Sequence, residues 1–261
     1  MVRTGAALQR AFDVRGFVVF ENVFSPDEVR RAREAFDRLA ARAASVENGE
    51  ERDGAVFFVH PIERGPRAGT KAIDRVCWAG AAEPALRRIG EDRRLLEPVS
   101  RLLGSESMDQ LINQAHFKLP DDGVTFPWHQ DSTHRRYGTD LWTDVNGRGS
   151  YVQTALALDD VDEHNGPLRF LPGSQRDGHR GLPRDGTLPP DLEAIEPVAA
   201  TMKAGSVALF GPYVVHGSTA NRSSRPRRVL INGYAYPGAN RRVYPGRGAG
   251  RRIDLDERAS A

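Results

Sequence analysis

Three residues carry the strongest chemical signal in this 261-residue sequence: His129, Asp131 and His216. His129 and Asp131 are two positions apart, and side chains alternate along a strand, so a strand here would present both on one face. Two imidazoles and one carboxylate can occupy one face of an octahedral metal and leave the opposite positions open, as in non-haem Fe(II) oxygenases. The residue types therefore predict an iron site that can accept further ligands.

A His-x-Asp match is short and can arise by chance, with both residues in a surface loop and His216 an unrelated buried histidine. The sequence that follows His216 favours the metal site, because Arg225, Arg227 and Arg228 stand at the start of an expected strand. An arginine there could form a two-pronged contact with the carboxylate of an organic acid bound to the metal. Strand alternation puts Arg225 and Arg227 on one face and Arg228 on the other.

Several further motifs occur in a fixed order around these residues. They are Gly16-Phe-Val-Val-Phe-Glu-Asn-Val-Phe-Ser-Pro-Asp-Glu-Val29, Trp128-His-Gln-Asp131, Asn165-Gly-Pro-Leu-Arg-Phe-Leu-Pro-Gly-Ser174, Lys203-Ala-Gly-Ser-Val-Ala-Leu-Phe210 and the segment from His216 to Arg228. With these motifs the chain resembles the phytanoyl-CoA dioxygenase (PhyH) superfamily of Fe(II)/2-oxoglutarate oxygenases, which includes ectoine hydroxylase. The resemblance extends from about Phe12 to Tyr236.

The resemblance implies a mechanism and a role for each motif residue. Fe(II) would be held by His129, Asp131 and His216, which are then also the catalytic residues, and 2-oxoglutarate and O2 would take the open positions. The reaction would release succinate and CO2 and hydroxylate an unactivated C–H of a small molecule. Spacing in the family favours Arg227 as the partner of the distal carboxylate of 2-oxoglutarate.

Three more residues are candidates for binding the cosubstrate. Ser218 shares a strand face with His216 and could contact 2-oxoglutarate, or it could be an ordinary strand serine. His116 stands where relatives such as ectoine hydroxylase carry an asparagine that contacts the cosubstrate, and a packed histidine is the alternative. Gln114 shares the face of His116 and could touch either small molecule.

Two other functions remain open at this stage. The same residues would also serve a desaturase, an epoxidase or a cyclase acting on a natural-product intermediate. A metal-binding jelly-roll without catalytic activity is the second possibility, although an intact metal triad together with an arginine for the cosubstrate argues against it. The sequence does not identify the substrate.

Patterning predicts helices before about residue 104 and strands and turns after it. Ser25-Pro-Asp-Glu28 is typical of a capped helix start, and this helix should run to about Ala44. Strands are expected at 107–119, 126–129, 151–158, 168–171, 206–210, 214–218 and 228–236. This order indicates a mainly β fold with flanking α-helices, a double-stranded β-helix of the jelly-roll or cupin type.

Length and composition predict one domain over residues 1–240, followed by a basic, flexible tail over 241–261. The formal net charge of +2 does not demand a nucleic-acid partner, and no apolar run is long enough to span a membrane. The start of the chain lacks the apolar core of a signal peptide, and the single Cys77 fits a reducing cytoplasm. A monomer or a homodimer acting on a small molecule is expected.

Overall fold

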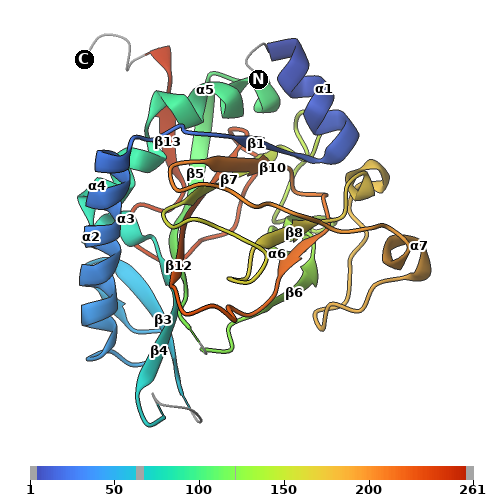
Figure 1. Cartoon of the computed structure of the whole chain (residues 1–261). Coiled ribbons are helices and arrows are strands. Elements are labelled where there is room, and N and C mark those ends of the chain that lie inside the picture. Colours follow the sequence, from blue (N-terminus) through green and yellow to red (C-terminus); the bar gives the residue numbers. More distant parts are fainter. Residues whose placement is uncertain (1–4, 63–67, 121, 257–261) are drawn as a thin grey trace.

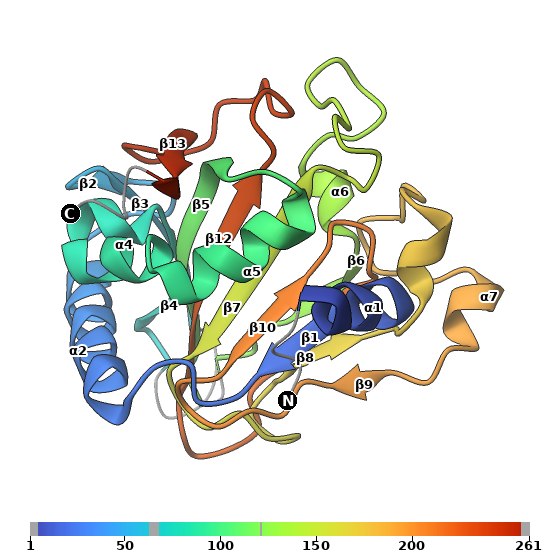
Figure 2. The same cartoon turned by 90° about the horizontal axis from the view of Figure 1, so that it is seen from above.

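Two antiparallel sheets face one another in the computed structural model, which describes residues 5–62, 68–120 and 122–256 (Figures 1 and 2). The larger sheet contains β1 (Phe17–Phe20), β2 (Glu51–Arg52), β3 (Ala55–Pro61), β4 (Lys71–Cys77), β5 (Ser107–Lys118), β7 (Tyr151–Ala157), β10 (Val207–Phe210), β12 (Arg227–Ala235) and β13 (Arg251–Asp254). Its order is β1-β10-β7-β12-β5-β4-β3-β2, and β13 pairs with the first half of β5. The smaller sheet contains β6 (Phe126–His129), β8 (Leu168–Phe170), β9 (Val198–Ala199) and β11 (His216–Ser218), in the order β6-β11-β8-β9.

Most of the helices cover the outer face of the larger sheet (Figure 2). The helical segments are α1 (Gly5–Arg15), α2 (Pro26–Ala43), α3 (Ala79–Ala82), α4 (Pro84–Gly90), α5 (Arg93–Leu103), α6 (Asp131–His134) and α7 (Pro190–Glu193), with a 3-10 turn at Ser174–Asp177. This arrangement confirms the predicted jelly-roll class, although the strands form two facing sheets and not one closed barrel. No helix in the described part of the chain is long and apolar enough to cross a membrane.

Helix α2 shows how the sequence fixes the outer layer. The Ser25 hydroxyl accepts a hydrogen bond from the backbone N–H of Glu28, and the Glu28 carboxylate accepts one from the N–H of Ser25, so both ends of the predicted cap are made. The buried face contains Phe36, whose ring centroid lies 4.9 Å from that of Phe117 on β5. Burial of a phenylalanine side chain contributes roughly 1.5–3 kcal/mol. The helix therefore holds the back of the strand that carries several site residues.

The inner face of the larger sheet is organised in rows across the strands. Lys118 on β5 is paired with Arg227 on β12, and in the next row His116 is paired with Val229 and with Arg75 on β4. Directly opposed residues in antiparallel strands point to the same side of the sheet. Each row therefore presents its side chains together toward the smaller sheet.

Two segments differ from the sequence-based expectations. Strand β4 was not predicted, because its charged Asp74 and Arg75 interrupt the apolar alternation. The basic segment from 241 was expected to be flexible, but residues 251–254 pair with β5 and Ile253 is buried. This short strand was not predicted, because the many arginines and glycines around it give no alternating apolar pattern. The end of the expected tail, 257–261, lies outside the described residues.

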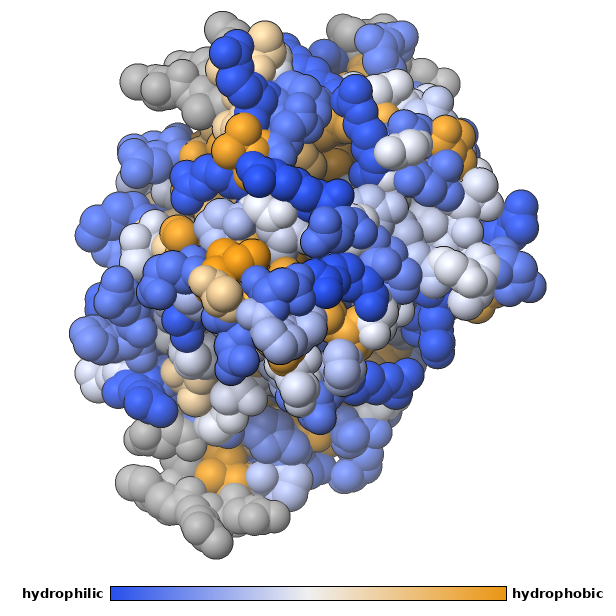
Figure 3. Space-filling model, turned by 90° about the vertical axis from the view of Figure 1, so that its right-hand side faces the viewer, coloured by the Kyte–Doolittle hydropathy of each residue, from blue (hydrophilic) through white to orange (hydrophobic). Residues whose placement is uncertain are grey.

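The face that carries the smaller sheet is mainly hydrophilic, and its apolar side chains lie in small separate groups (Figure 3). Exposed large apolar residues among those described are Val14, Leu141, Val145 and Val243. These are dispersed along the chain. Such scattered apolar positions are usual on a protein surface.

Gly233, on β12, gives a test of the packing of side chains between neighbouring strands of the larger sheet. A Cβ added there would collide with the Tyr151 hydroxyl and lie 2.7 Å from Ile112 Cγ1. Tyr151 cannot easily move, because its hydroxyl donates to Gln153 and accepts from Arg135. We expect Gly233→Ala to lower the free energy of unfolding by about 1–3 kcal/mol, measured by urea denaturation. Gly5→Ala is the control, since its nearest neighbour would be Arg101 Cδ at 3.7 Å, and equal losses in both variants would contradict this account.

Candidate active site

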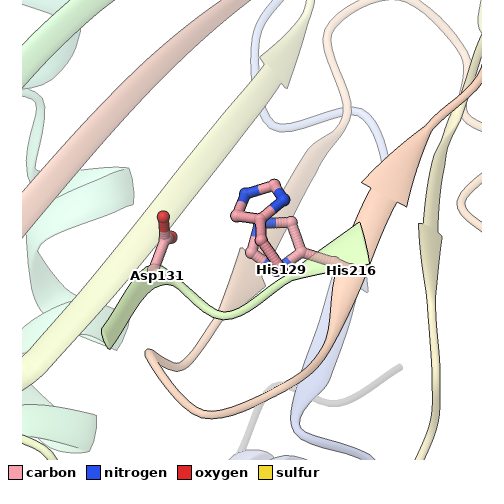
Figure 4. A group of neighbouring side chains, drawn as sticks. All are labelled: His129, Asp131 and His216. Atoms are coloured by element: carbon pink, nitrogen blue, oxygen red, sulfur yellow. The ribbon is translucent and has the colours of Figure 1, made fainter. Parts of the chain in front are cut away.

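The three predicted metal ligands come together between the sheets. Strand β11 pairs with β6 so that His216 lies directly opposite His129, and the two ring centroids are 4.2 Å apart. One ligand atom from each of His129, Asp131 and His216 lies within 4.8 Å of the others. Figure 4 shows the two imidazoles side by side, with Asp131 at the end of the connection that follows β6.

The local geometry of the His-x-Asp pair differs from the expectation. Strand β6 ends at His129, and Asp131 is the first residue of the one-turn helix α6, so the two do not share a strand face. The buried Gln130 between them fixes this junction. Its amide N–H donates to the carbonyl oxygens of Gly178 at 2.9 Å and Tyr213 at 2.6 Å. Sequence reasoning missed this positioning role, because a glutamine between two ligands carries no periodic signal.

Both histidines are held in the orientation that a metal ligand needs. Nδ1 of His129 lies 2.7 Å from the carbonyl oxygen of Pro127, and Nδ1 of His216 lies 3.0 Å from that of Val214. A ring that donates its Nδ1–H to a carbonyl keeps Nε2 free for a metal. Burial, together with the adjacent His129, lowers the pKa of His216 to about 4. Its imidazole is therefore neutral at pH 7, as metal binding requires.

Asp131 is the candidate for the anionic ligand. Burial opposes its ionisation, but the surrounding basic groups, His216 and Arg135 among them, hold the pKa of its carboxyl below the ordinary value. Its Oδ1 lies 4.0 Å from the Arg135 guanidinium, and its Oδ2 is buried without a hydrogen-bond partner. A buried carboxylate oxygen without a partner is costly. A divalent cation between the histidines and Asp131 would remove that cost, so the residues present fit a metal.

A pocket of about 370 Å³ opens over the triad, and residues of both sheets line it. Apolar side chains form much of its wall, namely Phe58, Ile112, Phe126, Leu168, Phe210, Val229 and Ile231. The polar lining includes every residue that was predicted to bind the metal or the cosubstrate. This size suits one cosubstrate and a small molecule beside it.

Arg227 is the one member of the arginine cluster that faces the pocket. It is buried, and its guanidinium donates to the carbonyl oxygen of Gly166, with Nε at 3.1 Å. Arg225 instead pairs with Asp162 at 2.6 Å, and Arg228 pairs with Asp159 at 2.9 Å. Burial lowers the pKa of Arg227 to about 10, so it remains charged at pH 7 without a carboxylate partner. Its surroundings suit a bound acid.

Lys118 is a second buried cation that the sequence analysis did not select. It lies opposite Arg227 in the β5–β12 ladder, and its Nζ donates to Ser218 Oγ at 2.7 Å and to the carbonyl oxygen of Thr219. Burial, reinforced by the charge of Arg227, lowers its pKa to about 6. The available signal was its position two residues after His116, on the same strand face as that candidate and Gln114.

The three softer candidates also line the pocket. Ser218 is buried and accepts the hydrogen bond from Lys118. The His116 ring lies 3.0 Å from the Gln114 side-chain oxygen, and burial lowers the pKa of His116 well below its usual value. The amide nitrogen of Gln114 approaches Cys77 Sγ at 3.4 Å. His116 is thus a neutral hydrogen-bonding group close to three basic side chains, those of Arg75, Arg227 and Lys118.

The two-sheet fold and the His129–Asp131–His216 set define a non-haem iron oxygenase of the jelly-roll type. The chain matches the family described as phytanoyl-CoA dioxygenase (PhyH) over residues 12–229, and it belongs to that family. It is therefore a 2-oxoglutarate-dependent non-haem iron dioxygenase, with Fe(II) and 2-oxoglutarate as its cofactor and cosubstrate.

Relatives of described activity and a solved structure agree with this assignment. L-proline trans-4-hydroxylase of Streptomyces griseoviridis is 27% identical over 247 residues, which are 84% of this chain and 82% of that protein. Ectoine dioxygenase of Sphingopyxis alaskensis is 29% identical over 240 residues, which are 83% of this chain and 71% of that protein. The crystal structure of EctD from S. alaskensis with 2-oxoglutarate and 5-hydroxyectoine has a TM-score of 0.72 at 26% identity, covering 96% of this chain and 88% of that one.

The metal site can be tested by removing one ligand. We expect His216→Ala to weaken Fe(II) binding by more than about a hundredfold, because a buried ligand is lost from a three-residue set. Anaerobic titration with Fe(II), followed by metal analysis of the isolated protein, measures this. His134→Ala is the matched control, since its ring lies 5.0 Å from that of His129 but outside the triad. Equal loss of iron in both variants would contradict the assignment.

Proposed function

We propose that the protein hydroxylates an unactivated C–H bond of a small molecule, with 2-oxoglutarate and O2 as cosubstrates and succinate and CO2 as products. The observation that carries this proposal is the juxtaposition of the intact triad with the buried Arg227 in the same pocket lining. Lys118 lies opposite Arg227 in the ladder and donates to the lining residue Ser218. A metal site alone would need no such pair. A dicarboxylate that also binds the metal accounts for both.

His129, Asp131 and His216 are the proposed Fe(II) ligands and catalytic residues. Bound iron, together with 2-oxoglutarate and O2, supplies an oxidant able to attack an unactivated C–H bond. The protein's own task is to hold the ligands and exclude water. The carbonyl oxygens of Pro127 and Val214 orient the imidazoles, and apolar walls such as Phe210 beside His216 limit access of solvent.

Arg227 and Lys118 are proposed to bind the distal carboxylate of 2-oxoglutarate. Arg227 offers a planar, two-pronged donor, whereas Lys118 offers a point charge that Ser218 and the backbone already orient. Burial and the charge of Arg227, directly opposite in the ladder, lower the pKa of Lys118 to about 6 in the free protein. A bound carboxylate would stabilise the protonated form of Lys118 beside Arg227. The site therefore favours a dianion over a monocarboxylate of the same shape.

Ser218, His116 and Gln114 are proposed as additional cosubstrate-binding residues. The Ser218 hydroxyl oxygen accepts a hydrogen bond from Lys118, and its O–H can donate to a second partner. His116 and Gln114 are already hydrogen-bonded to each other, so they can offer one donor or acceptor as a unit. His116 and Gln114 occupy the two rows that follow Lys118 along the same face of β5. This position supports contact with a molecule that reaches from Arg227 to the metal.

The cellular setting and the assembly are part of the same proposal. We infer a single domain that extends past the expected boundary at 240 to include β13. It works in the cytoplasm as a monomer or homodimer, without a nucleic-acid or membrane partner. A formal net charge of +2 and a lone, buried cysteine support this inference. The same machinery would also support desaturation, epoxidation or cyclisation. The product mass separates these, since hydroxylation adds one oxygen and desaturation removes two hydrogens.

The cosubstrate can be tested without knowing the substrate. We expect the anaerobic protein, given Fe(II) and then 2-oxoglutarate, to develop the visible charge-transfer band of a chelated 2-oxo acid. His216→Ala should abolish the band, and Arg227→Ala should raise the 2-oxoglutarate concentration needed for it by about a hundredfold, because a buried charge pair is lost. Arg225→Ala is the control, since that arginine pairs with Asp162. A folded, iron-loaded protein without the band would overturn the proposal.

Lys118 predicts a pH dependence of cosubstrate binding. In the free protein its pKa is about 6, so it is mainly neutral at pH 7.5, and a bound carboxylate should raise that pKa. Binding then takes up a proton, and the affinity for 2-oxoglutarate should fall as the pH rises above 6. Calorimetric titration in two buffers of different ionisation enthalpy counts the protons. Lys118→Met should show no uptake, and wild-type binding without uptake would argue against contact between Lys118 and the cosubstrate.

A further inference from the structure

The pocket contains more positive charge than iron and 2-oxoglutarate require. Among the described residues that line it are the arginines Arg75, Arg135, Arg227 and Arg242, whereas Asp131 is the one acid. The two charges of Fe(II) and that of Arg227 are balanced by Asp131 and a dianionic cosubstrate. Three arginines remain. Arg135 is partly accounted for, because it donates to Tyr151 and Gln153 and lies near Asp131.

Arg75 reaches the pocket from the β3–β4 edge of the larger sheet. It lies opposite His116 and opposite Phe58 in their ladders, and its guanidinium carbon is 4.4 Å from the centre of the Phe58 ring. Its ion pair with the neighbouring Asp74 is long, at 3.9 Å. The side chain leans toward β3, away from β12. Strand β12, which carries Arg227, lies two strand spacings or roughly 10 Å from β4.

Arg242 reaches the same pocket from the segment that follows β12. Its guanidinium donates to the carbonyl oxygen of His134 at 2.7 Å and lies 5.1 Å from the centre of the Tyr244 ring. No ion pair with an acid is found for it in the described part of the chain. Its contacts place it beside α6, where Asp131 begins. The family match ends at residue 229, so this arginine lies outside the part of the chain that the family defines.

We propose that Arg75 and Arg242 form the substrate-recognition subsite and that the substrate is a small molecule with a carboxylate or an equivalent anionic group. The proposal rests on the proposed function, because it assigns the space that the cosubstrate leaves free. The anion would lie between the wall formed by β3 and β4 and the segment after β12. The remainder of the substrate would lie against the apolar wall near Ile112 and Ile231 and present its C–H bond to the metal.

Two features argue against a purely structural role for these arginines. A structural arginine is normally paired with acids, as Arg228 is with Asp159 and Asp37. Arg75 has one long ion pair, with Asp74, and no ion pair is found for Arg242 among the described residues. Each guanidinium lies over an aromatic ring, which orients it and leaves further N–H groups available to a ligand. The cosubstrate already has Arg227 and Lys118. A second anion, carried by the substrate, is the remaining partner.

The test uses matched acids and amides on the full-length protein. L-proline, L-pipecolate and ectoine, each beside its carboxamide, are titrated into the anaerobic complex with Fe(II) and 2-oxoglutarate, followed by calorimetry and by the change in the visible band. Succinate release in air is measured in parallel. The variants are Arg75→Gln, Arg75→Lys and Arg242→Gln. Arg241→Gln is the matched control, because it removes the same charge from an exposed neighbour outside the pocket lining.

We expect the acids to bind and the amides to bind much more weakly. Arg75→Gln and Arg242→Gln should each weaken binding of the acids by about ten- to a hundredfold, the effect of losing a charge-assisted hydrogen bond. Arg75→Lys should recover part of the loss, and the 2-oxoglutarate titration should be unchanged throughout. Amides that bind as well as acids, variants that behave like Arg241→Gln, or a panel without any binding acid would overturn the subsite. Formation of the band shows in each case that the oxygenase site itself is intact.

Discussion

The antiparallel pairing of β5 with β12 is the constraint on which the site depends. It opposes Lys118 to Arg227 and His116 to Val229, and the following rows continue to Ala235. A slip of one residue would turn Lys118, His116 and Gln114 to the outer face, where α2 packs against Phe117. The apolar outer face therefore specifies the register, because it is buried under the helices. The same register aligns the polar side chains of the inner face.

The metal ligands depend on a different and shorter pairing. Only three residues of β11 are in the smaller sheet, and His216 is aligned with His129 through this short ladder. Such a ladder would be weak alone. Gln130 reinforces it by bonding to the segments that precede β11, and stacking of Phe17 on Phe170, with centroids 4.2 Å apart, ties β8 to the larger sheet. The geometry of the triad thus relies on contacts made by residues that bind no ligand.

The sequence predicted the parts of this protein whose signal is periodic or chemically rare. The strand Phe126–His129 agrees to the residue, and α2 begins at the predicted cap and ends at Ala43, one residue before the predicted end. Strand β4 was missed because Asp74 and Arg75 look like surface residues until the pocket is seen beside them. The turn that begins α6 was missed because it depends on the contacts of Gln130 with distant segments. Lys118 was missed for a similar reason, because a lysine in a strand is normally expected to be exposed. Here it is buried next to a second basic side chain, Arg227.

Buried positive charge connects these observations. Lys118 and Arg227 are buried without an ion pair to any described residue, and burial lowers the pKa of each. The fold can tolerate this because Ser218, Thr219 and Gly166 satisfy the donors through neutral oxygens. Neutral partners stabilise the cations only in part, so an incoming carboxylate gains more than it would beside a saturated ion pair. The fold holds these basic groups in place before the anion binds. Their electrostatic field therefore favours the bound anion. Arg75 and Arg242, proposed to bind the substrate, belong to the same pocket lining, and each guanidinium lies over an aromatic ring, that of Phe58 or of Tyr244.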